Sequence, residues 1–364
     1  MKKFVVGLML VLSLASCGKK NEAPKENEKQ AIKIGITVPL TGPMGFAGEN
    51  MKKSLAMAME GIDQERLKYK YELIIEDNSF DNRKTVTNLN KFLHMDNVNA
   101  VMSFFGSSGT ITSQFAEKNK IVHMSCAWSN EVAKGFYNFN HDTKPMTTIK
   151  KVIEYFHQKK YKKIAFIYHS ILEVEELMKW FVPLLQQEGF EIVADIPYIE
   201  PARDFKMEIE KIKAANPDVV YIQSVPPELT IFAKQRKEGN LNIPVVGFNI
   251  FGFAPEGWEN EVYATESTGK HDFEEKFTQY SGLNPMPCTG NFYDGLRMLI
   301  QAFENVGDGK TVPSSEEIVK EIYKFNSDNF TSVFDRFEID EEGNIDIPTV
   351  MKVIKNGKPV LLNE

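Results

Sequence analysis

Two kinds of apolar pattern alternate along most of this chain. Residues 32–38 form a short run rich in β-branched side chains, which predicts a strand. Residues 49–66 instead place Met51, Leu55 and Met59 at the three- to four-residue spacing of a helix with one buried face. The alternation continues, with strands expected at 71–76, 100–102 and 121–124 and helices at 82–93 and from residue 108.

The same alternation starts again near residue 145. Helices are expected at 145–158, 172–187, 204–215 and 228–238, and strands at 163–168, 191–196, 218–222 and 244–247. Strands that alternate with helices of this length favour parallel sheets covered by helices on both faces. The two series therefore predict an α/β protein with two doubly wound lobes.

The pattern changes after residue 265. Helices are expected at 273–280, 291–304 and 315–325, followed by strands at 333–338 and 350–354. Because this end of the chain continues neither series, we expect it to cross between the lobes. We assign residues 31–141 and 266–330 to the first lobe, and residues 142–265 and 331–364 to the second.

The N-terminus resembles the leader of a bacterial lipoprotein. Two lysines precede an apolar run at 4–14 that is too short to span a bilayer, and Leu14-Ala15-Ser16-Cys17 follows. We expect removal of a signal peptide at 1–16 and lipid attachment at Cys17, which would anchor the protein outside the cytoplasm to a bacterial membrane. An ordinary secretory signal with an incidental cysteine is the alternative. The polar segment that completes 17–30 predicts a flexible tether.

Composition excludes several classes of function. The chain has 364 residues, of which 42% are apolar and 26% charged, as in ordinary globular proteins. A net charge of −7 without a basic stripe argues against a nucleic-acid partner. The six histidines lack metal-ligand spacing, and no nucleophile elbow or dinucleotide fingerprint occurs, so we expect no metal, no cofactor and no enzyme. Cys126 and Cys288 are expected to be free, buried thiols, although their spacing does not exclude a disulfide between them.

The turns that follow the strands carry the candidate chemistry, because open parallel sheets bind ligands beyond the carboxyl ends of their strands. The first strand leads into a glycine- and proline-rich loop at 39–48, with Phe46 near its tip as either a core or a ligand-facing ring. The third leads into Gly-Ser-Ser at 106–108, whose hydroxyls and free N–H groups could hold a carboxylate or carbonyl oxygen, or only cap a helix. The fourth leads into a small polar turn that contains Trp128.

The order of these motifs resembles a known family. Pro39-Leu40-Thr41-Gly42-Pro43, Glu76-Asp77-Asn78, Gly106-Ser107-Ser108 and Tyr221 followed by Pro227-Glu228 are similar to the leucine/isoleucine/valine-binding protein family, over about 32–358. The resemblance implies a type I substrate-binding protein of an ABC importer: a monomer whose two lobes, joined by three crossings, close on a small solute and present it to permease subunits. A sensor of the same fold that signals to a partner protein is the alternative.

The resemblance also implies ligand contacts. Those in the first lobe are Phe46 or Ala47, Ser107, Ser108, Ala127, Trp128 and Ser129, and those in the second are Glu173 and Asn249. The family's Tyr-Gly is missing from 168–174, its first-lobe disulfide looks absent, and Asn249 stands where a carboxylate often meets the ligand's ammonium group. We therefore expect a small amino-acid-like, carboxylate or amide solute other than an ordinary branched-chain amino acid, unless Glu173 or Glu228 replaces the lost charge.

Overall fold

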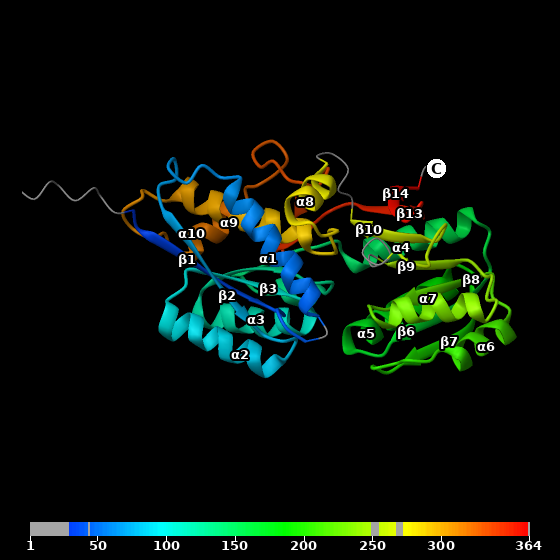
Figure 1. Ribbon diagram of the computed structural model, residues 1–364. Helices are drawn as coiled ribbons and strands as arrows, with labels where there is room; N and C mark the ends of the chain where they lie inside the picture. The colour runs from blue at the N-terminus through cyan, green and yellow to red at the C-terminus, as the bar shows by residue number, and fades with distance from the viewer. Residues whose placement is uncertain (1–28, 43, 249–254, 267–271, 363–364) are drawn as a thin grey trace, which may run out of the picture.

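The computed structural model, which describes residues 29–42, 44–248, 255–266 and 272–362, contains two separate seven-stranded sheets. Figure 1 shows the two lobes side by side, each with helices on both faces of its sheet. This arrangement confirms the predicted two-lobed α/β fold. The expected signal peptide and the lipid-attachment residue Cys17 lie outside the described residues.

The first sheet has the strand order β11-β12-β5-β4-β3-β1-β2. Its strands are β1 (Ala31–Val38), β2 (Lys70–Asp77), β3 (Ala100–Phe104), β4 (Val122–Cys126), β5 (Asn138–His141), β11 (Glu338–Ile339) and β12 (Asn344–Asp346). All neighbours pair in parallel except β11 with β12. The strand order reverses between β1 and β3, so the connections that follow these two strands run to opposite sides of the sheet. Such a reversal leaves a crevice beyond the carboxyl ends of the two strands.

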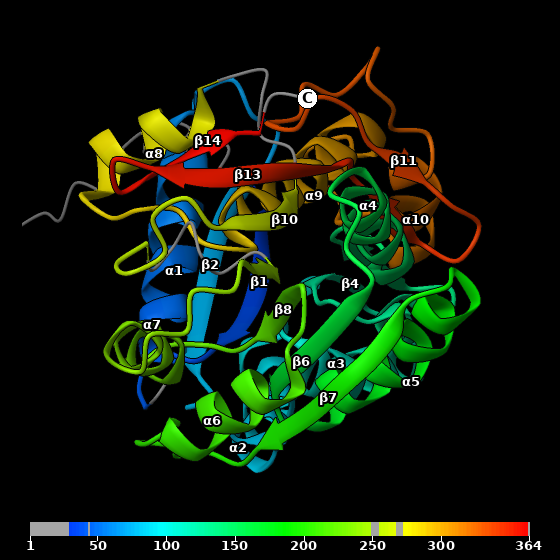
Figure 2. The same cartoon turned by 90° about the vertical axis from the view of Figure 1, so that its right-hand side faces the viewer.

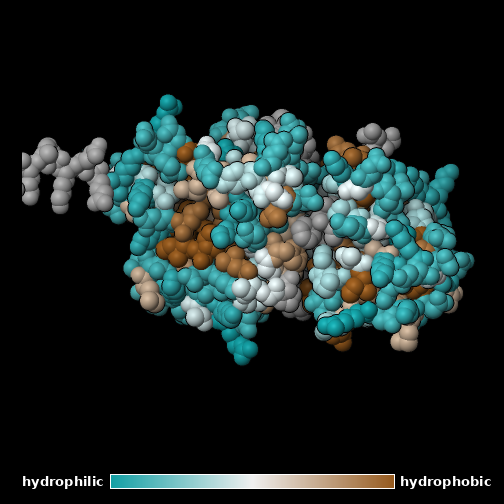
Figure 3. Space-filling view, in the orientation of Figure 1, coloured by the Kyte–Doolittle hydropathy of each residue, from teal (hydrophilic) through white to brown (hydrophobic). Residues whose placement is uncertain are grey.

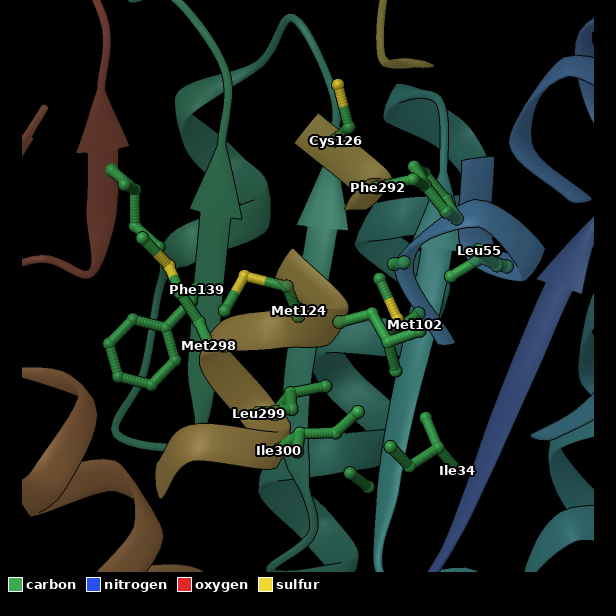
Figure 4. Close-up of a cluster of buried hydrophobic side chains, with 14 of the residues drawn as sticks. Ile34, Leu55, Met102, Met124, Cys126, Phe139, Phe292, Met298, Leu299 and Ile300 are labelled. Atoms are coloured by element: carbon green, nitrogen blue, oxygen red, sulfur yellow. The ribbon is translucent and has the colours of Figure 1, made fainter. Parts of the chain in front are cut away.

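Helices cover both faces of the first sheet. One face carries α1 (Gly45–Glu60), α8 (Phe273–Ser281), α9 (Thr289–Val306) and α10 (Ser315–Ile322), and the other carries α2 (Asn82–Lys91) and α3 (Gly106–Asn119). Figure 4 shows α9 lying across β3 and β4, with Met298 and Leu299 beside Met102 and Met124. Burial of this apolar face supplies the main driving force that holds the lobe together.

The second sheet repeats the arrangement, in the order β14-β13-β10-β9-β8-β6-β7. Its strands are β6 (Lys163–His169), β7 (Glu191–Tyr198), β8 (Val219–Gln223), β9 (Val245–Phe248), β10 (Val262–Glu266), β13 (Thr349–Lys355) and β14 (Lys358–Leu361). Figure 2 shows α4 (Pro145–Gln158) and α5 (Leu172–Gln187) on one face, and α6 (Lys206–Ala215) and α7 (Glu228–Glu238) on the other. Only β13 and β14 run antiparallel to their neighbours.

The chain passes between the lobes three times, as predicted. It crosses from β5 to α4, from β10 to α8 and from β12 to β13. The first and third crossings lie side by side, because the Lys144 backbone N–H donates to Asp346 Oδ1 at 2.9 Å. This arrangement makes the crossings the natural hinge between two rigid lobes.

The C-terminal segment 331–364, which was expected in the second lobe, is divided between the two lobes. Strands β11 and β12 join the first sheet, and Phe334, Phe337 and Ile345 are buried in the first-lobe core. The strand expected at 333–338 was wrong, since only Glu338 of that segment pairs in a strand. The strand expected at 350–354 is confirmed within β13.

Hydrophilic side chains cover most of the face of the molecule seen in Figure 3. Figure 3 shows mainly hydrophilic side chains over both lobes on one face, with an apolar area over the first lobe. Within the described ranges, no helix has both the length and the hydrophobicity to cross a bilayer.

Candidate functional site

A cavity of about 930 Å³, counting the part open to solvent, lies between the lobes at the carboxyl ends of the parallel strands. The first lobe contributes Met44, Phe46, Phe104, Phe105, Gly106, Cys126, Ala127, Trp128, Asp142, Met286, Pro287 and Cys288. The second contributes His169, Ile171, Val174, Gln223, Ser224, Val225, Pro226 and Phe248. Since both lobes form the wall, a solute in the cavity would touch both.

Apolar side chains make up most of the wall of this cavity, which we call the interlobe cavity, and five of them are aromatic. Trp128 of the first lobe and Phe248 of the second are stacked, with ring centroids 4.4 Å apart and planes inclined by 24°. Phe46, Phe104 and Phe105 line the first-lobe side. Flat apolar walls of this kind favour a flat or apolar solute body.

Helix α3 begins at the wall of the interlobe cavity. Phe105, which precedes its first residue, has a φ of 75°, a value that is unusual for a residue with a side chain. Its N–H donates to the Cys126 carbonyl oxygen at 3.0 Å, and its ring packs edge-on against Phe80 at 4.8 Å. The next residue, Gly106, lines the cavity, so the N-terminal end of α3 lies at its wall.

The two serines expected to bind the ligand are placed differently. The Ser108 hydroxyl is buried within the first lobe, 3.4 Å from Asn78 Nδ2 and 3.4 Å from Thr85 Oγ1. The Ser107 side chain lines an adjoining cavity that runs between α3 and α5 and shares Gly106 and Trp128 with the first. The two adjacent serines therefore have different surroundings: Ser107 lines the adjoining cavity, whereas the Ser108 hydroxyl contacts Asn78 and Thr85 inside the lobe.

Three of the other expected contacts, Phe46, Ala127 and Trp128, line the interlobe cavity. Ala47 is fully buried in the first-lobe core. Ser129 lines the adjoining cavity, and its hydroxyl accepts a hydrogen bond from the Glu131 N–H at 3.3 Å, which caps a short helical turn.

The expected second-lobe contacts fall outside what the structure describes: the Glu173 side chain and the whole of Asn249. The described wall of the second lobe depends instead on residues that sequence reasoning did not select.

Cys126 and Cys288 form a disulfide, with Cα atoms 5.7 Å apart. The expectation of free thiols is therefore wrong, and the first lobe does contain a disulfide. The two cysteines are 162 positions apart in sequence, and the packing of α9 against β4 brings them together. Both cysteines line the interlobe cavity, so the cross-link is part of its wall.

Asp142, at the first crossing, was missed by sequence reasoning. It lies in the wall of the interlobe cavity with 7% of its surface exposed. Oδ1 accepts from the Thr143 N–H at 2.7 Å and from the Thr143 hydroxyl at 3.4 Å, whereas no described residue donates to Oδ2. Burial, and then the nearby carboxyl of Glu266, raises the pKa of Asp142 well above its usual range. An isolated Asp-Thr dipeptide gives no signal in the sequence that could have identified it.

The polar groups of the second lobe gather around His169 and Ser224. Ser224 Oγ lies 2.7 Å from the Tyr198 hydroxyl, and the His169 ring stacks on Tyr198 at 5.7 Å. Burial lowers the pKa of His169, which keeps its imidazole neutral near pH 7. Glu228 is also buried but does not line the interlobe cavity, and its Oε2 has no hydrogen-bond partner among the described residues.

The described residues offer one grouping of possible metal ligands, namely Cys126, Cys288 and Asp142. Its two sulfur atoms are bonded to each other in the disulfide. Metal binding requires thiolates, so this grouping does not fit a metal ion.

Comparisons with known proteins agree with this geometry. The family model described as periplasmic binding protein matches residues 31–357. The chain is similar to the Leu/Ile/Val-binding protein homolog 7 of Brucella suis biovar 1 (strain 1330), with 21% identity over 328 residues that cover 84% of this chain and 76% of the relative.

Two solved structures share the fold. A solute-binding protein of an ABC transporter from R. palustris, in complex with benzoate, has a TM-score of 0.81 and 16% identity, covering 92% of this chain and 96% of that chain. The branched-chain amino acid transporter substrate-binding protein LivJ from Streptococcus pneumoniae, in complex with isoleucine, has a TM-score of 0.79 and 19% identity, covering 91% and 98%.

Proposed function

This chain belongs to the periplasmic binding protein family, and on that premise we propose that it is the extracytoplasmic solute-binding lipoprotein of an ABC importer. A member of this family binds solutes and is not an enzyme. The observation that carries the proposal is the interlobe cavity, whose wall is built jointly by residues such as Trp128 and Phe248 from opposite lobes.

Such a wall accounts for capture by hinge closure. A solute that touches both lobes binds the closed form more tightly than the open form, and this difference in affinity shifts the population toward closure. The three crossings, of which the first and third lie side by side, would let the lobes rotate as rigid bodies. The permease would then recognise the closed shape.

The anchor is the second part of the proposal. The leader that ends in Leu14-Ala15-Ser16-Cys17 supports lipid attachment at Cys17, and the polar segment after it supports a tether between the membrane and the lobes. Two or three acyl chains hold a protein durably at a membrane.

The proposed solute is small, with a flat or apolar body, and is not an ordinary branched-chain amino acid. The aromatic rings of Phe46, Trp128 and Phe248 support a flat body. Amino-acid-like solutes, carboxylates and amides remain in this class, and the similar proteins bound to benzoate and to isoleucine show that the fold accepts both a flat ring and an aliphatic chain.

Native mass spectrometry of the purified protein, before and after partial unfolding and dialysis, tests the function by identifying a bound solute. A thermal-shift screen of common amino acids, small amides and carboxylates then tests the class. Strong stabilisation by micromolar leucine, isoleucine or valine would contradict the proposed ligand class and leave the solute-binding function intact. Absence of any bound or stabilising solute would contradict the function itself.

A further inference from the structure

The cleft between the lobes continues beyond the interlobe cavity. The adjoining cavity between α3 and α5 has a volume of about 1120 Å³, counting the part open to solvent. It shares Gly106 and Trp128 with the interlobe cavity, so the two cavities meet at these residues. Figure 1 shows α3 and α5 on the facing sides of the two lobes. A solute held between the lobes can therefore reach into both cavities.

The walls of the two cavities differ in chemistry. Whereas the interlobe cavity is mostly apolar, the adjoining cavity gathers uncharged side chains that can donate and accept hydrogen bonds, namely Asn82, Ser107, Thr110, Gln114 and Ser129. Within the described part of the chain, no residue pairs with the side chain of Ser107 or Gln114. Trp180 of α5, which is 41% exposed, adds a ring from the second lobe. Such a wall suits a polar group flanked by apolar surface.

The adjoining cavity offers little to a charged group. Its described wall contains two acidic residues, Glu131 and Glu176, and no lysine, arginine or histidine. Each carboxylate already lies beside a lysine: Lys134 Nζ is 2.7 Å from Glu131 Oε1, and Lys179 Nζ is 3.4 Å from Glu176 Oε1. An anion would meet these carboxylates, and a cation would meet carboxylates that are already paired. A neutral hydrogen-bonding group therefore fits this wall best.

Trp128 connects the two cavities and carries a hydrogen-bond donor without a partner. Its ring stacks on Phe248, whereas its buried Nε1–H donates to no described residue. A buried donor that stays unpaired costs about 1–3 kcal/mol, and a tryptophan N–H usually has an acceptor. Separation of the stack as the lobes open would give an entering solute access to this N–H. The missing acceptor therefore points to an oxygen atom of the solute.

We propose that the adjoining cavity is a second subsite, which binds a neutral amide or hydroxyl extension of the solute. The flat or apolar body of the solute lies in the interlobe cavity, and an oxygen of the extension accepts from Trp128 Nε1. Gln114 and Ser107 bind the polar atoms further along the extension. This inference rests on the proposed solute-binding function and narrows its ligand class to solutes longer than the interlobe cavity alone would hold.

Four probes that share one flat body test the inference. Benzamide has no extension, and the other three carry extensions of the same size and shape: N-benzoylglycinamide (neutral amide), N-isobutylbenzamide (apolar) and N-benzoylglycine (anion). Affinities are measured by calorimetry and thermal shift in the wild type, in Trp128→Phe, which keeps a ring but removes the N–H, and in Gln114→Ala. Gln187→Ala is the matched control, since this glutamine is exposed on α5 and lines neither cavity.

We expect the wild type and Gln187→Ala to bind N-benzoylglycinamide about tenfold or more tightly than its apolar isostere, because only the amide satisfies the polar groups of the wall. Trp128→Phe and Gln114→Ala should each reduce this preference about twofold to tenfold, as expected for loss of one neutral hydrogen bond. The ratio of the two affinities is the measured quantity, so a general change in ring packing cancels.

Two results would overturn the inference. The first is binding of the apolar or the anionic probe to the wild type as tightly as N-benzoylglycinamide, a comparison that does not need the variants to fold. The second is a preference that stays unchanged in both Trp128→Phe and Gln114→Ala, which would place the extension elsewhere. Failure of all four probes at millimolar concentration overturns the inference too, whereas the solute-binding function is judged separately from the solute found by native mass spectrometry.

Discussion

Trp128 and Phe248 stack across the cleft, with ring centroids 4.4 Å apart, although 120 positions separate them in sequence and they belong to different lobes. Opening of the lobes would separate these two rings. The stack therefore contributes to the stability of the closed form, and changes to it should alter the balance between the open and closed forms.

Trp128→Ala should shift this balance toward the open form. A stacked aromatic pair contributes about 0.5–1.5 kcal/mol beyond its buried area, so closure should weaken roughly twofold to tenfold, with a matching loss of ligand affinity. Small-angle X-ray scattering would detect the larger radius of gyration. Phe136→Ala, which removes an exposed ring outside both cavities, is the control. An unchanged radius and affinity in Trp128→Ala would mean that the stack is incidental.

The disulfide should contribute strongly to stability. Cys126→Ser combined with Cys288→Ser should lower the free energy of unfolding by about 2–4 kcal/mol, because the cross-link restricts the unfolded chain over a long loop. Chemical denaturation with and without a reductant measures the effect. The reductant should destabilise the wild type and leave the double variant unchanged; equal sensitivity in both would rule out the disulfide as the cause.

The two adjacent serines should separate into two roles. Ser108→Ala removes buried hydrogen bonds to Asn78 and Thr85, so it should lower stability by about 1 kcal/mol without changing ligand affinity. Ser107→Ala should leave stability unchanged and weaken binding of a solute that reaches the adjoining cavity. Calorimetry and thermal unfolding of both variants measure the two effects, and the reverse pattern would contradict the observed orientations.

Two buried histidines should make the free energy of unfolding decrease as the pH is lowered. Burial lowers the pKa of His123 and of His141 to about 4, below the ordinary value near 6.5. As pH falls from about 6.5 to about 4, the unfolded chain takes up protons that the folded protein does not bind. Each histidine therefore removes up to about 1.4 kcal/mol of stability per pH unit in that window.

His141→Gln should flatten this slope by up to about 1.4 kcal/mol per pH unit. Urea unfolding at several pH values measures it. Burial also raises the pKa of Asp294 to about 6, and this shift changes stability with pH in the opposite direction. The slope of the variant is therefore compared with that of the wild type, in which Asp294 contributes equally. His94→Gln, at an exposed position, should leave the slope unchanged. Identical slopes in His141→Gln and the wild type would contradict the assignment.

Cys17→Ser should release the protein from membranes or block its processing, because the thiol carries the expected lipid. Membrane fractionation with a mass measurement of the N-terminus checks this outcome. Cys126→Ser, which changes a cysteine of the folded body, is the matched control and should still fractionate with membranes. Cys17→Ser protein found in membranes at its mature size would rule out the anchor.

Local patterns predicted the repeated elements well, and long-range relationships much less. The β-branched run at 32–38 and the spacing of Met51, Leu55 and Met59 report on burial within a few residues, and they gave β1 and α1. The segment 333–338 misled because its apolar residues pack into the first-lobe core as irregular chain, without the alternation of a strand.

The site shows the same division. The turns after β1 and β4 could be identified from the sequence, and Phe46 and Trp128 do line the interlobe cavity. Asp142 could not be identified from the sequence, because its place in the cavity wall depends on burial and on neighbours that belong to the other crossings. The Cys126–Cys288 bond likewise depends on how α9 packs against β4, which spacing along the chain does not encode.

That bond also has a topological consequence. The loop it closes, 126–288, contains the first two crossings and the strands β6 to β10, which form most of the second lobe. The second lobe is thus largely an insertion whose two ends are joined at its base. A protease that cuts once inside this insertion would leave both pieces covalently linked, and they would separate on a denaturing gel only after reduction.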